Sequence, residues 1–184
     1  VISNVYIKGV NNAELKNEIG SDYALSSGGK NVVYDGITFP EYVSFNSKAE
    51  NVTFKNCTFK GGLKVMQAAN VTVDNCKFEG NGTNDYAFFA QAVPANSMKA
   101  VQFNNNTVSG FMRGLNVEAE GAAVTISGNT IKNISGKTDG FTYGSAIQLT
   151  RGKTFTVTKN TISDVAVNAL HIYNGCAADS IIIN

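Results

Sequence analysis

Apolar and polar residues alternate in a nine-residue pattern that recurs along most of the chain. Residues 51–59, NVTFKNCTF, show it most clearly: the second, fourth and ninth positions are apolar, and the seventh is Ile, Cys or Asn in every full copy. Full copies begin at Asn31, Asn51, Asn70, Ala100, Ala123 and Thr154, a weaker copy begins at Asn4, and a truncated one begins at Ser180. Alternation with a period of two predicts β-strand.

A second alternating segment follows the pattern in most units. These segments are Tyr42–Phe45, Leu63–Met66, Leu115–Glu118, Ile147–Thr150 and Leu170–Tyr173. Gly62, Gly114 and Gly144 come shortly before three of them, as expected at corners where the backbone turns sharply. Units this short cannot bury their own apolar side, so they must stack on one another. The pattern therefore predicts a solenoid of strands.

Two other repeat architectures fit less well. A leucine-rich repeat also has an asparagine at the position that Asn106, Asn129 and Asn160 occupy here. However, this chain uses Val, Ile and Phe where that repeat requires Leu. A left-handed hexapeptide helix would need a strict period of six, and the copies are spaced irregularly. The chain resembles the right-handed parallel β-helix superfamily, the pectate-lyase-like fold, in its repeated strand motif and its glycine-bounded second strand. We expect an all-β, single-stranded right-handed parallel β-helix of about seven coils.

We expect residues 1–184 to form one domain, because a single repeat pattern covers essentially the whole chain. Terminal rungs of a solenoid expose strand edges that need a cover. The chain begins inside a strand motif and stops at Ile181-Ile-Ile183. The sequence therefore leads us to expect a longer parent protein, an end-capping domain or a partner chain.

Stacking in register converts repeat positions into columns. The seventh positions give an inward column that changes from apolar or thiol to amide: Ile37, Cys57, Cys76, Asn106, Asn129 and Asn160. Stacked asparagines can hydrogen-bond from rung to rung, so we expect a structural ladder there. Cys57 and Cys76 lie close enough for a disulfide, but we favour two buried free thiols. Outward, the fifth positions Lys8, Asp35, Lys55 and Asp74 alternate in charge, which favours correct register.

Composition excludes several functions. Lys and Arg number 15 against 14 Asp and Glu, for a net charge of +1, so there is no basic surface for nucleic acid. No apolar run approaches the length of a membrane span. His171 is the single histidine, and no metal-ligand spacing accompanies it, so we expect no metal site and no cofactor.

Candidate chemistry lies on the second strand. Aligning those segments places four residues on one outward line: Lys64, Asn116, Gln148 and His171. Beside this line lie Met66, Glu118, Thr150 and Tyr173, and Arg113 and Arg151 lie at adjoining turns. Such a strip is either an ordinary solvated sheet face or a shallow groove that binds a sugar polymer. The two longest inserts, Glu79–Lys99 and Asn133–Gly144, also carry aromatic residues, and Tyr86–Ala92 in the first has the pattern of a second strand.

The resemblance implies an extracellular or cell-surface bacterial protein that acts on or binds polysaccharide. Lyases of this fold place calcium-binding carboxylates on neighbouring rungs, whereas the second strand here offers only Glu118, with Glu120 just beyond it. We therefore assign no catalytic residue and expect a noncatalytic glycan-binding or structural module. The alternative is a polysaccharide lyase or glycoside hydrolase that acts on an acidic, plant or host polysaccharide.

Overall fold

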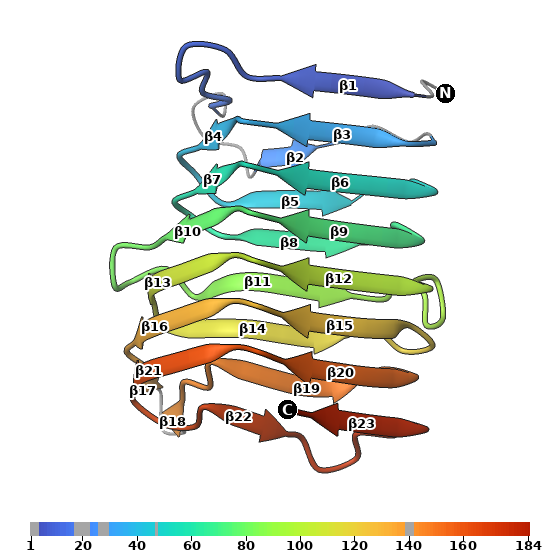
Figure 1. Cartoon of the computed structure of the whole chain (residues 1–184), viewed down its shortest axis with the longest axis vertical. Coiled ribbons are helices and arrows are strands. Elements are labelled where there is room, and N and C mark those ends of the chain that lie inside the picture. Colours follow the sequence, from blue (N-terminus) through green and yellow to red (C-terminus); the bar gives the residue numbers. More distant parts are fainter. Residues whose placement is uncertain (1–3, 17–22, 26–29, 47, 139–141) are drawn as a thin grey trace.

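The protein is a solenoid of short strands (Figure 1). The computed structural model describes residues 4–16, 23–25, 30–46, 48–138 and 142–184. In this part of the chain three parallel sheets run along the axis of the solenoid, and each turn of the chain, called a rung below, contributes strands to them in order. The predicted all-β parallel β-helix is confirmed.

Sheet A contains the first part of the repeat. Its strands, in spatial order, are β1 (Val5–Lys8), β3 (Val32–Asp35), β6 (Asn51–Lys55), β9 (Asn70–Asp74), β12 (Ala100–Asn104), β15 (Ala123–Ser127), β20 (Thr154–Thr158) and β23 (Ser180–Ile183). All neighbours are parallel and pair without a register shift, so that Phe54 lies beside Val73 and Val73 beside Phe103. Residues at equivalent positions of the repeat therefore lie side by side in sheet A, as the sequence led us to expect.

Sheet B contains the end of the repeat, which the sequence did not reveal as a separate strand. Its strands, in spatial order, are β21 (Thr161–Val165), β16 (Thr130–Ile134), β13 (Thr107–Phe111), β10 (Lys77–Glu79), β7 (Thr58–Phe59) and β4 (Thr38–Phe39). The chain bends between sheets A and B at the sixth position of the repeat. That residue has a positive φ of 51° to 68° in Gly36, Asn56, Asn75, Asn105, Gly128 and Lys159. Glycine and asparagine adopt this left-handed conformation more easily than other residues, which explains their prevalence at the bend.

Sheet C contains the second alternating segments. Its strands, in spatial order, are β2 (Tyr23–Leu25), β5 (Val43–Asn46), β8 (Leu63–Met66), β11 (Tyr86–Gln91), β14 (Arg113–Glu118), β19 (Ile147–Arg151) and β22 (Leu170–Ile172). Strand β11 confirms that the first long insert contains the second strand of its rung. The short strands β17 (Lys137–Thr138) and β18 (Thr142–Tyr143) form a separate antiparallel pair.

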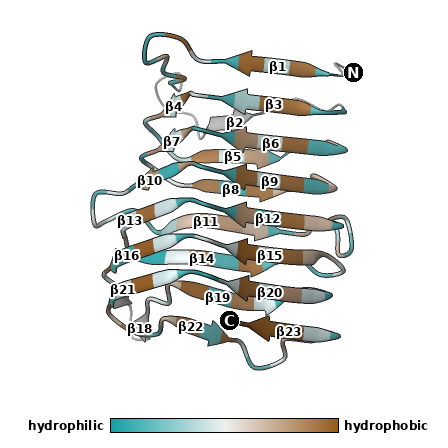
Figure 2. Ribbon diagram, viewed as in Figure 1, coloured by the Kyte–Doolittle hydropathy of each residue, from teal (hydrophilic) through white to brown (hydrophobic). Residues whose placement is uncertain are grey.

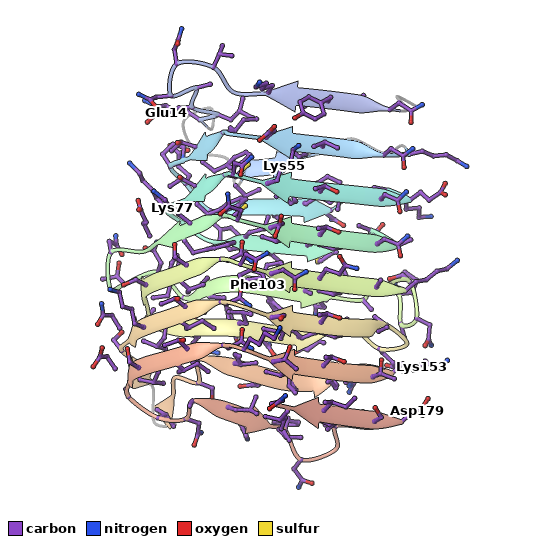
Figure 3. All side chains as sticks on the ribbon, viewed as in Figure 1. Glu14, Lys55, Lys77, Phe103, Lys153 and Asp179 are labelled. Atoms are coloured by element: carbon purple, nitrogen blue, oxygen red, sulfur yellow. The ribbon has the colours of Figure 1, made fainter. Side chains whose placement is uncertain are left out.

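The core consists of inward columns from all three sheets. Figure 2 shows hydrophobic residues at matching places in the successive strands of sheet A. The aromatic rings of Phe39, Phe59 and Phe78 are stacked from rung to rung, with centroids 4.9 Å and 4.8 Å apart. Phe103 of β12, labelled in Figure 3, is fully buried. Rings repeated at the spacing of the rungs pack against one another, which stabilises the stack.

The inward seventh column is the predicted ladder. Asn106 Nδ2 donates to the carbonyl of Val73 (3.0 Å) and its Oδ1 accepts the backbone N–H of Cys76 (2.7 Å). Asn129 and Asn160 make the equivalent bonds, Nδ2 to the carbonyls of Phe103 and Ile126 and Oδ1 from the N–H groups of Asn106 and Asn129. The ladder thus satisfies backbone groups that the bend removes from the sheets.

Cys57 and Cys76 occupy the same column as free, buried thiols, as predicted. The Cys76 thiol donates to the carbonyl of Phe54 (3.5 Å) and accepts the N–H of Cys57 (3.4 Å), which repeats the asparagine arrangement with weaker partners. Burial raises the pKa of the Cys76 thiol, so it stays protonated and able to donate.

The outward fifth column also has the predicted register, with Lys8 beside Asp35, Asp35 beside Lys55 and Lys55 beside Asp74. Asp35 forms an ion pair with Lys55 (3.5 Å) and accepts hydrogen bonds from Tyr6 and Asn56. Those hydrogen bonds, the one from Tyr6 first, hold the pKa of Asp35 below its ordinary value. This column connects the first rungs through charged side chains.

Candidate functional site

The outer face of sheet C carries one continuous column of chemically varied side chains. Strand pairing places Lys64 beside Phe89, Phe89 beside Asn116, Asn116 beside Gln148, and Gln148 beside His171. The line predicted from the sequence therefore exists in this register, with Phe89 as an additional member. We refer to this surface as the sheet C face.

Two aromatic residues of β11, Tyr86 and Phe89, form what we call the aromatic platform. Their ring centroids lie 5.1 Å apart. The Lys64 ammonium lies 4.8 Å from the centre of the Phe89 ring, and the Arg113 guanidinium lies 4.8 Å from that of Tyr86. Arg113 also donates to the Tyr86 hydroxyl (2.6 Å) and pairs with Asp85 (2.9 Å). Cations held against ring faces fix both groups in place.

Beside the platform lies a polar network that crosses β11, β14 and β19. Glu118 accepts hydrogen bonds from Gln91 Nε2 and from Asn116 Nδ2, each at 3.2 Å. Thr150 Oγ1 donates to Asn116 Oδ1 (2.9 Å) and accepts from Gln148 Nε2 (3.2 Å). We refer to these five residues as the polar network. Each member is held by another, so the network presents its remaining hydrogen-bonding groups in fixed directions.

Asn116 does not point freely into solvent as the sequence led us to expect. Its side chain is buried, with 2 % of the residue exposed, because Phe89 and Gln148 flank it in the column and Glu118 and Thr150 occupy its hydrogen bonds. Asn116 therefore positions Glu118 and Thr150 rather than presenting its amide to a ligand.

A β-bulge changes the expected neighbours of Glu118. The pairing of β14 with β19 shifts between Val117 and Glu118, so Glu118 lies beside Arg151 instead of Thr150. Bulges redirect side chains at the ends of strands. Here the bulge brings Arg151, which the sequence placed at an adjoining turn, next to the carboxyl end of β14.

Arg151 connects the sheet C face to a surface depression of about 560 Å³. The depression lies at the turns that lead from sheet C to sheet A and is lined by Asn96, Glu120, Gly121, Arg151, Gly152, Lys153, Gly175 and Ala177. Arg151 forms an exposed ion pair with Glu120 (3.6 Å). Lys153 lies at the turn before β20 (Figure 3), where its carbonyl accepts the backbone N–H of Asp179.

His171 and Tyr173 lie at the far end of the same face, in and just after β22. Their ring centroids are 6.2 Å apart, and Tyr173 is 49 % exposed. They stand apart from the aromatic platform, because β14 and β19 lie between β11 and β22. The predicted site residues are thus spread over one face: Lys64 contacts the platform, Asn116, Glu118 and Gln148 belong to the polar network, and His171 and Tyr173 lie apart from both.

Tyr86, Phe89 and Gln91 belong to this surface, although the sequence pattern did not place them there. All three lie in the long insert, where successive repeats begin 30 residues apart, so the repeat spacing does not give the register of this strand. The signal that points to them is the alternating segment Tyr86–Ala92, whose pairing adds Phe89 to the column of Lys64 and Asn116.

Among the described residues no three His, Cys, Asp or Glu side chains gather where they could hold a metal ion. None of the described segments is a helix long and apolar enough to cross a membrane. These findings concern only the part of the chain that the structure describes.

Comparison with known proteins identifies the fold family. A family model described as a right-handed β-helix region matches residues 2–146. The chain therefore belongs to the right-handed β-helix family, in agreement with the stacked parallel sheets. No curated protein and no solved structure matches the chain significantly.

Proposed function

We propose that the protein is a noncatalytic glycan-binding module that holds a sugar polymer on the sheet C face. The aromatic platform beside the polar network is the observation that supports this proposal. Aromatic rings such as Tyr86 and Phe89 offer flat apolar surface to the C–H face of a sugar ring. Amide, hydroxyl and carboxylate groups beside them pair with sugar hydroxyls and fix their orientation.

Preorganisation also favours a binding role. The rings are held by Lys64 and Arg113, and the network residues are held by one another. Ordering of free side chains on binding typically costs about 0.5–1.5 kcal/mol for each one. A surface that is already ordered avoids much of that loss, and a solvated sheet face without function has no need of such order.

The contacts of the carboxylates favour binding over bond cleavage. One oxygen of Glu118 accepts a hydrogen bond from Asn116 and the other accepts one from Gln91. Asp85 pairs with Arg113. Hydrolysis of a glycosidic bond uses a pair of carboxyl groups placed on either side of that bond, whereas Glu118 and Asp85 already contact protein side chains. A role outside the cell or on its surface, where polysaccharides are abundant, is part of the proposal.

Binding of the purified protein to a panel of polysaccharides, with assays for new reducing ends and unsaturated products, tests the proposal. We expect binding without product formation, and a loss of at least about tenfold in affinity for Phe89→Ala, which removes half of the platform. Val33→Ala, an apolar truncation on the outer face of sheet A, is the matched control and should leave binding unchanged. Product formation that Glu118→Gln abolishes would show a lyase or hydrolase instead, and no binding to any polysaccharide would refute the proposal.

A further inference from the structure

We infer that the glycan held on the sheet C face is uncharged, and that Glu118 discriminates against acidic sugars. This inference rests on the proposed function and concerns the same surface. It follows from the ion pairs, ring contacts and hydrogen bonds that the charged groups of that face already make.

The cation beside the aromatic platform already has its partners. Arg113 lies 2.9 Å from the carboxylate of Asp85 and against the ring of Tyr86, whereas Arg151 makes an exposed and weaker pair with Glu120 at 3.6 Å, at the edge of the face. Recognition of a carboxylate or sulfate depends on an Arg or Lys that offers its N–H groups. An acidic ligand at the platform would have to draw Arg113 from Asp85 and leave that carboxylate without its cation.

Lys64 is the third cation, and it lies over the Phe89 ring at 4.8 Å. In this position its ammonium is held against one face of the Phe89 ring and helps to fix that ring in place. An acidic group drawn to Lys64 would pull the ammonium from the ring and disturb the platform. The interaction therefore competes with stacking rather than adding to it.

Glu118 is the central charge of the network. A carboxylate has about four lone-pair sites, and the amides of Gln91 and Asn116 use two of them. The remaining sites can accept hydrogen bonds from sugar hydroxyls, which are donors. A uronate or sulfate group has no proton to donate at neutral pH and would be repelled by the Glu118 charge.

Positive and negative charges are close to balanced both on the face and over the whole protein. With the turn residues of the adjoining depression included, the described cations are Lys64, Arg113, Arg151 and Lys153, the described carboxylates are Asp85, Glu118 and Glu120, and the whole chain has a net charge of +1. An excess of one positive charge is too small to steer acidic polymers strongly to this surface. Binding should consequently be almost insensitive to salt.

Titration calorimetry with the full chain tests the inference. The probes are β-linked gluco-, manno- and xylo-oligosaccharides, and oligogalacturonate and oligoglucuronate of matched length. We expect the protein to bind at least one neutral series with an affinity that changes less than twofold between about 0.05 M and about 0.5 M salt, and to bind the acidic series at least about tenfold more weakly. Tighter binding of an acidic series that is lost in salt would overturn the inference and leave the proposed function standing. Binding of neither class, checked against a wider panel, would count against the proposed function itself.

Glu118→Gln isolates the role of the charge, because it keeps the shape of the side chain. We expect the variant to bind the neutral ligand several-fold more weakly. The ratio of its affinity for the neutral ligand to its affinity for the acidic ligand should fall by about tenfold. Glu79→Gln in β10, an exposed residue on sheet B, removes the same charge from another face and should change neither affinity. An unchanged ratio in Glu118→Gln, with the fold intact by circular dichroism, would show that Glu118 does not discriminate.

Discussion

At the seventh position of the repeat, asparagine and cysteine are alike in one respect: each donates a hydrogen bond to a backbone carbonyl and accepts one from a backbone N–H. Asn106 and Cys76 both donate to a carbonyl on the preceding rung and both accept the N–H of that rung's ladder residue. They differ in strength, since sulfur is a weak donor and a weak acceptor, and in number, since the Asn106 amide also donates to Asn129 Oδ1 (3.2 Å). The requirement at this position is therefore a small side chain that can serve two backbone groups.

Removing a ladder amide should be costly for stability. Asn106→Ala leaves the N–H of Cys76 and the carbonyl of Val73 without these partners in a buried site, so we expect the free energy of unfolding to fall by about 2–4 kcal/mol. Asn70→Ala is the control, because Asn70 also bonds from rung to rung but is partly exposed, and water can replace its partners. Asn70→Ala should lower the free energy of unfolding by less than about 1 kcal/mol. Equal losses in urea unfolding would contradict the special role of the inner ladder.

At the scale of the element, the sequence predicted the strands of sheets A and C and their inward columns, because an alternating apolar pattern reports directly on burial. It did not separate sheet B from sheet A. The division depends on the backbone conformation at residues such as Asn56 and Gly128, and polar residues at a bend leave no trace in apolar periodicity. For the candidate site, register predicted Lys64, Gln148 and His171 on one line, but the bulge before Glu118 is a backbone feature that hydropathy does not encode.

Substitution at the bend between sheets A and B tests whether its left-handed backbone conformation is strained. Lys159 occupies it with φ at 57°, where a side chain with a Cβ is strained by about 1–2 kcal/mol. Lys159→Gly relieves that strain but makes the unfolded chain more flexible, so we expect a net gain of about 0.5–1 kcal/mol in the free energy of unfolding. The same change in a strand, Lys132→Gly in β16, should instead destabilise the protein by a similar amount. Urea unfolding of both variants gives the comparison, and a loss for Lys159→Gly would be inconsistent with strain at the bend.

At the scale of the whole molecule, burial is uneven along the axis. Ile126 and Ile183 belong to one inward column, with Val157 between them. Ile126 is fully buried, whereas Ile183 in the last strand of sheet A is 55 % exposed. In a solenoid each rung is stabilised mainly by its neighbours, so the contribution of a residue depends on its rung as well as on its column. The domain or partner chain expected at an end stays a prediction, since no partner is part of the structure.

The two isoleucines make this dependence measurable. We expect Ile126→Ala to lower the free energy of unfolding by about 2–5 kcal/mol, because it opens a cavity between two rungs. Ile183→Ala should lower it by less than about 1 kcal/mol, because much of that side chain is already in contact with water. Similar losses would mean that the last strand is as well packed in solution as the middle of the molecule.

The parallel stacking of rungs also determines how the protein responds to mechanical force. The hydrogen bonds that join neighbouring strands of all three sheets run along the axis, so tension on the two ends of the chain would pull rungs away one at a time. The released lengths would differ, since β6 and β9 begin 19 residues apart, at Asn51 and Asn70, and β15 and β20 begin 31 residues apart, at Ala123 and Thr154. Fully extended, these stretches span about 65 Å and about 110 Å. A tethered molecule would thus lengthen in unequal steps, each of which identifies the rung that has opened.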